Sequence, residues 1–80
     1  MKLTPKQLDK LREAFRLSPR ELEVLVLLLQ GVESNEALAQ RLGVTVPTAK
    51  TTLRFLYAKT GRSTKHGVVV LLVDMLQPRS

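Results

Sequence analysis

Signals for helix starts and stops recur so closely along this chain that they leave room for little besides short helices. A hydroxyl residue, a proline and then a glutamine or glutamate occur twice at one spacing, in Thr4-Pro5-Lys6-Gln7 and Ser18-Pro19-Arg20-Glu21. At a helix N-terminus the hydroxyl accepts the third amide hydrogen, the long side chain reaches back, and the proline loses no hydrogen bond. Glycines that suit left-handed helix ends follow at Gly31, Gly43 and Gly61. The pattern predicts an all-α fold.

These signals divide the chain into five predicted helices with short connections. The first four cover residues 5–16, 19–30, 35–42 and 46–60, and the last begins near Ser63 or Thr64 and ends at Leu76. A chain of 80 residues is long enough for one domain only. We expect residues 1–16 to form an N-terminal amphipathic helix and residues 17–77 to form the main four-helix unit.

The positive charge of the chain is confined to its middle. Residues 1–40 carry six basic and six acidic side chains, and residues 66–80 carry one of each. Residues 41–65 contain no acid and hold the whole excess, in Arg41, Lys50, Arg54, Lys59, Arg62 and Lys65. A patch of one sign is typical of a protein that binds a polyanion, although a solvated basic face is the simpler alternative.

The composition does not favour catalysis or a membrane location. The chain has no cysteine and a single histidine, His66, so it offers no thiolate metal site and no nucleophile with a paired base. We expect neither a cofactor nor an enzyme activity. The longest apolar run, residues 68–73, is far shorter than the ~20 residues that span a bilayer. The charged N-terminus is unlike a signal peptide, so a cytoplasmic location is expected.

The link between the third and fourth predicted helices has the form of a tight turn. Gly43-Val44-Thr45 joins a short helix to a longer one, as in a helix-turn-helix. One broad face of the longer helix collects its apolar residues, and the opposite face collects Pro47, Lys50, Thr51, Arg54 and Ala58. Two cations four residues apart, with a hydroxyl and small groups beside them, suit a helix in the major groove of DNA. We therefore expect Lys50, Thr51 and Arg54 to face bases.

Further cations follow at the end of this helix and in the next loop. Lys59, Arg62 and Lys65 are placed there to meet phosphates.

The two aromatic residues of the helix differ in their expected surroundings. Either ring could stack on bases, but Tyr57 falls on the predicted core face, which favours core packing, whereas Phe55 lies between the faces and is not placed.

An ordered string of residues extends through about three quarters of the chain, from Leu17 to Leu76. It includes Leu17-Ser18-Pro19-Arg20-Glu21-Leu22-Glu23-Val24-Leu25, Gly31, Asn35-Glu36-Ala37-Leu38-Ala39-Gln40-Arg41-Leu42, Thr48-Ala49-Lys50 and Lys59. This string resembles the LuxR-type (GerE-type) DNA-binding domain, and the chain is similar to its small stand-alone members.

The resemblance implies a four-helix domain that binds double-stranded DNA, usually as a dimer, and controls bacterial transcription. RNA polymerase is then a further expected partner. The resemblance also implies that Lys50, Thr51 and Arg54 face bases, and that Thr45, Thr48 and Lys59 meet the DNA backbone.

The last predicted helix has more apolar surface than one neighbour can cover. Residues 68–76 are apolar around most of the helix circumference, while packing on a helical body hides a stripe of roughly 100°. A twofold dimer through this helix would bury the surplus and place two reading helices on a pseudo-palindrome. We expect Val69, Val73 and Leu76 to face the partner. Alternatively, the N-terminal helix covers this surface and the protein is a monomer.

Two other functions compete with a transcription regulator that binds DNA. The related helix-turn-helix of a sigma factor reads promoters and shares much of this pattern. A protein-interaction adaptor on the same fold would bind no DNA, and the basic, acid-free helix face argues against it.

Overall fold

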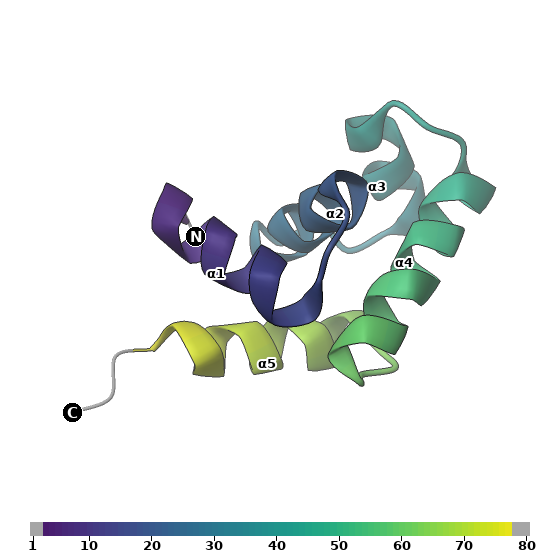
Figure 1. The fold of residues 1–80 in the computed structure, drawn as a ribbon. Helices are drawn as coiled ribbons and strands as arrows, with labels where there is room; N and C mark the ends of the chain where they lie inside the picture. The colour runs from purple at the N-terminus through teal and green to yellow at the C-terminus, as the bar shows by residue number, and fades with distance from the viewer. Residues whose placement is uncertain (1–2, 78–80) are drawn as a thin grey trace.

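Five α-helices make up the computed structural model, which describes residues 3–77 (Figure 1). In chain order they are α1 (Pro5–Phe15), α2 (Pro19–Leu29), α3 (Asn35–Leu42), α4 (Val46–Thr60) and α5 (Lys65–Leu76). The described range contains no strand. The predicted all-α class is therefore confirmed.

Both predicted capping boxes form at the starts of α1 and α2. The amide of Gln7 donates to Oγ1 of Thr4 at 3.1 Å, and the Thr4 amide donates to Oε1 of Gln7 at 2.9 Å. In α2, the Glu21 amide donates to Oγ of Ser18 at 3.2 Å, and the Ser18 amide donates to Oε1 of Glu21 at 2.9 Å. Each box satisfies two amides that a helix start would otherwise leave without partners.

Two helices end one residue earlier than predicted. Arg16 was expected inside α1, but it is the left-handed residue that follows the helix, with φ of 53°. Gln30 was expected inside α2, and it is that helix's C-cap. The backbone turns at Arg16, and the amides of Arg16 and Leu17 donate hydrogen bonds to carbonyl oxygens in the last turn of α1. The left-handed backbone of a non-glycine residue is unfavourable and needs such support.

A single hydrophobic cluster joins the five helices. Helix α2 lies in the middle and contacts α3, α4 and α5 (Figure 1). Helix α1 contributes Leu11, which is fully buried. The buried apolar residues are Leu11, Leu17, Val24, Leu25, Leu28, Leu38, Ala39, Leu42, Ala49, Leu53, Leu56, Val68 and Leu72.

Two basic side chains tie neighbouring helices together through backbone carbonyls. The Arg20 guanidinium of α2 donates to the carbonyl oxygen of Leu42 at 3.0 Å, where α3 ends. The Lys65 ammonium, at the start of α5, donates to the carbonyl oxygen of Glu33 in the loop before α3. Carbonyls at helix ends and in loops have no helical partner, so these contacts satisfy them.

Candidate nucleic-acid interface

Helix α4 is divided along its length into a buried and an exposed face. Ala49, Leu53 and Leu56 are buried, and Val46, Tyr57 and Thr60 are half-buried beside them, as the sequence predicts. Burial also raises the pKa of the Tyr57 phenol above its usual 10.0. The residues predicted for the opposite face are all exposed: Pro47, Lys50, Thr51, Arg54 and Ala58.

The start of α4 is fixed by its own threonines. Thr45 is the N-cap, and its Oγ1 accepts from the Thr48 amide at 3.4 Å and donates to Oγ1 of Thr48 at 3.0 Å. Both threonines are exposed. Polar hydrogens at a helix N-terminus attract anions, which is compatible with the backbone contacts that the family resemblance implies for these two threonines.

The two cations expected to face bases are free to do so. Lys50 and Arg54 are exposed, lie four residues apart, and make no ion pair or side-chain hydrogen bond within residues 3–77. Residues four apart on a helix lie one above the other on the same side. Both groups are therefore available to an external acceptor.

Thr51, between these cations in sequence, has its hydroxyl engaged within the helix. Its Oγ1 donates to the carbonyl oxygen of Pro47 at 3.0 Å. In this arrangement the outer surface at Thr51 presents a hydroxyl acceptor and a methyl group, and the hydroxyl hydrogen points back to the helix.

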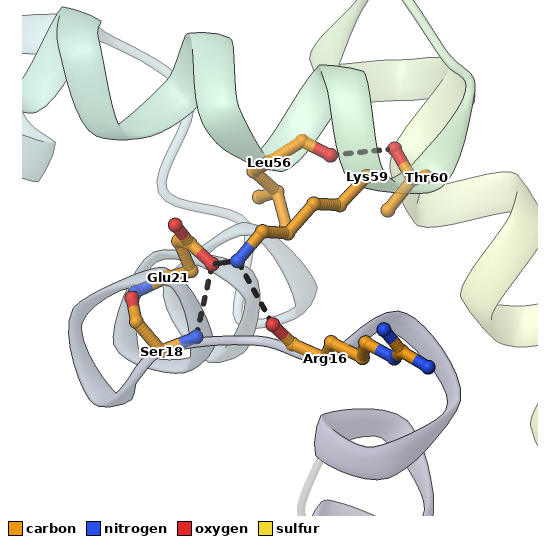
Figure 2. A network of polar contacts seen from close by, with 6 residues as sticks. All are labelled: Arg16, Ser18, Glu21, Leu56, Lys59 and Thr60. Carbon is orange, nitrogen blue, oxygen red and sulfur yellow. Dashed lines mark hydrogen bonds and ion pairs between the residues drawn. The ribbon is translucent and has the colours of Figure 1, made fainter.

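Lys59 takes part in a network that sequence reasoning missed (Figure 2). Its ammonium lies 2.6 Å from Oε1 of Glu21 in α2 and donates to the carbonyl oxygen of Arg16 at 2.8 Å. The same Glu21 oxygen accepts the Ser18 amide of the capping box. The C-terminal end of α4 is thereby attached to the link between α1 and α2.

The Glu21 carboxylate is stabilised in its charged form by this network. The residue is only 6 % exposed. Its burial raises the pKa of the carboxyl, but the hydrogen bond and charge of Lys59, with the amide and hydroxyl of Ser18, outweigh burial and hold the pKa below 4.5. Glu21 is thus an internal counterion for Lys59.

The three cations expected to meet phosphates are placed differently from one another. Lys59 and Lys65 each already donate to acceptors of their own chain. Arg62 is exposed and makes no side-chain hydrogen bond within the described residues. Arg62 is therefore the member of this set whose whole donor capacity is open to a phosphate.

Phe55 lies on the outer side of α4 and is 57 % exposed. In the sequence it falls between the two faces of the helix, about 40° around the axis from Thr51 and about 100° from Leu56. The structure assigns it to the side that carries Thr51 and Arg54.

The surface expected to form a dimer belongs to α5. Val68 and Leu72 are buried, and Val69 and Leu76 are partly buried against the same core. Val73 is half-buried outside that cluster, and Val70 is 47 % exposed. Of the three residues predicted to face a partner, Val73 is thus the one least engaged by its own chain.

Comparisons with known proteins identify no relative. No family model matches the chain, and no curated protein or solved structure matches it significantly. The resemblance to LuxR-type domains therefore stays a prediction from the sequence. In the described range, no helix is both long and apolar enough to cross a bilayer, and no three His, Asp or Glu residues gather into a metal-binding group.

Proposed function

We propose that this protein binds double-stranded DNA sequence-specifically as a regulator of transcription, with α4 in the major groove. The observation that carries the proposal is the exposed face of α4. It presents Lys50 and Arg54, which have no side-chain partner among residues 3–77, in a stretch from residue 37 to residue 73 that contains no acid.

The dimensions of α4 suit this role. Its 15 residues make a rod of about 22 Å at 1.5 Å per residue, and a major groove about 12 Å wide admits one α-helix. Lys50 and Arg54 have the length to reach guanine O6 and N7, while the small Pro47 and Ala58 allow close approach. Thr45, Thr48 and Arg62 lie at the two ends of α4, where a groove-bound helix meets the sugar-phosphate backbone.

The proposal includes a homodimer through α5. Val70 and Val73 leave apolar surface outside the core of one chain, and a second copy related by a twofold axis would cover it. Two α4 helices would then read two half-sites about one helical turn apart. The LuxR-type resemblance supports the same assembly, a cytoplasmic location and contact with RNA polymerase.

Selection of bound sequences from a random pool, followed by titration at several salt concentrations, tests the proposal. We expect one preferred, pseudo-palindromic sequence. With about three phosphate contacts per chain, the plot of log affinity against log salt should have a slope of roughly −5 for a dimer. Enrichment of no sequence together with a slope near zero would contradict DNA binding and favour the protein-interaction adaptor. Enrichment of promoter elements only, and only with RNA polymerase present, would favour the sigma-like module.

A further inference from the structure

We propose that Phe55 is a specificity-determining residue that contacts the 5-methyl group of a thymine in the major groove. The inference rests on the proposed DNA binding and adds a residue to the reading surface. Phe55 is one of two large apolar side chains that are exposed in residues 3–77, the other being Val70 on α5. Single exposed apolar residues are common on protein surfaces; what distinguishes Phe55 is its place beside the residues proposed to face bases.

Phe55 lies within the surface proposed to face bases. Thr51 precedes it by four residues and Ala58 follows by three, so the three side chains share one side of α4. All three are exposed. Arg54, the adjacent residue, borders the same side. Phe55 is about 40° around the helix from Thr51 and about 100° from Arg54, so a groove that receives Thr51 and Arg54 has the Phe55 ring at its edge.

The surroundings of Phe55 favour an apolar partner. The hydroxyl of Thr51 donates to the Pro47 carbonyl oxygen, and that of Thr52 donates to the Thr48 carbonyl oxygen at 3.1 Å. Both hydroxyl hydrogens are thus directed back to the helix. Ala58 adds only a methyl group. The thymine methyl is the apolar group that base pairs present in the major groove, and phenylalanine is among the side chains suited to it.

The helix geometry also restricts where that thymine lies. Phe55 is about 1.5 Å farther along the helix axis than Arg54 and about 6 Å farther than Thr51. Base pairs are stacked about 3.4 Å apart. The thymine should therefore lie within about two base pairs of the position at which Arg54→Ala relaxes the base preference.

Replacement of single thymines by uracil tests this contact, because uracil pairs like thymine and lacks only the methyl group. The selected operator is prepared with one thymine at a time replaced in each half-site, and the full chain is titrated on each DNA. We expect the wild-type protein to lose about four-fold in affinity per half-site at one thymine, the equivalent of one buried methyl group.

Variants then connect this loss to Phe55. We expect Phe55→Ala to bind thymine and uracil DNA equally at that position, and Phe55→Leu to keep part of the discrimination. Ala14→Ser, a change at an exposed position of α1 to which no binding role is given, should discriminate like the wild type. Circular dichroism confirms that the variants are folded, which the exposure of Phe55 leads us to expect.

The outcomes separate this inference from the proposed function. Specific binding with no uracil-sensitive thymine, or with the same sensitivity in Phe55→Ala, would overturn the role of Phe55 and leave DNA binding intact. The same holds if the sensitive thymine lies far from the Arg54-dependent position. Failure of the wild-type chain to prefer any DNA sequence would overturn both.

Discussion

The Lys59 ammonium of α4 lies 2.6 Å from the Glu21 carboxylate of α2, and these residues are 38 positions apart in the chain. The pair is only partly open to water, with exposed fractions of 34 % for the lysine side chain and 9 % for the glutamate side chain. Because Lys59 also donates to the Arg16 carbonyl, this one side chain links α4 to the start of α2 and to the C-cap of α1.

Removal of the Lys59 charge should destabilise the fold. We expect Lys59→Met to lower the free energy of unfolding by about 1–3 kcal/mol, because it leaves the buried Glu21 carboxylate without its counterion. Lys50→Met is the matched control on the same helix. The Lys50 ammonium is exposed and has no partner in the described part of the chain, so its loss should change the free energy of unfolding by less than about 0.5 kcal/mol. Urea unfolding measures both. A double-mutant cycle with Glu21→Gln that shows no coupling would contradict a stabilising pair.

The stability of the protein should fall in acid because of Glu21. The pKa of this carboxyl is lowered in the folded protein from an ordinary 4.5, so the folded state binds the proton less readily than the unfolded chain. The resulting stabilisation is complete above pH 4.5 and is lost as the pH falls through the folded pKa.

Unfolding of the wild type and of Glu21→Gln between pH 7 and pH 3 measures this effect. Glutamine keeps the carbonyl oxygen that the capping box needs, so the comparison isolates the ionised charge. The stability difference between the two proteins should shrink below pH 4.5. A difference that stays constant over this range would exclude the pair as its source.

Substitutions on α4 should divide into those that change sequence preference and those that do not. Lys50→Ala and Arg54→Ala should each cost about 1–3 kcal/mol of binding and relax the preference at particular base pairs. Arg62→Ala should weaken binding to all sequences about equally. Selection from a random pool is repeated with each variant to compare the preferred sequences. If Lys50→Ala and Arg54→Ala both select the wild-type operator, another face of the protein meets the bases.

Arg62 is a cleaner probe of phosphate contact than Lys59. Both were expected to meet the DNA backbone, and that expectation stays a prediction for each. Substitution of Lys59, however, also removes the contacts with Glu21 and Arg16. Weaker DNA binding by Lys59→Ala would therefore combine a lost phosphate contact with a displaced helix.

Self-association should depend on Val73. Val73→Asp would put a charge into the proposed α5 interface, and we expect it to turn a dimer into a monomer at micromolar concentration. Val73 is preferred to Val69 or Leu76, because those two residues also pack against the core of their own chain. Sedimentation over a concentration series, with Ala14→Asp on the exposed side of α1 as the control, makes the measurement. A wild-type monomer both free and on DNA would contradict the dimer.

Features that depend on residues close together in the sequence could be predicted from it. The two capping boxes join residues three apart, and the burial of Leu53 and Leu56 follows from the helical period. The left-handed backbone of Arg16 could not be predicted, because arginine has no preference for it. The Lys59–Glu21 pair was equally hidden, since periodicity shows which face of a helix is buried and not which residues meet between helices.

The type of acceptor that each basic side chain binds, backbone carbonyl or side chain, affects which positions of the sequence can change independently. Arg20 and Lys65 bind the carbonyl oxygens of Leu42 and Glu33, which every amino acid supplies, so positions 42 and 33 can change without loss of these particular bonds. Lys59 differs, because one of its two acceptors is the side-chain carboxylate of Glu21. In other chains with this fold, we expect positions 21 and 59 to change together, and positions 33 and 65 to vary independently.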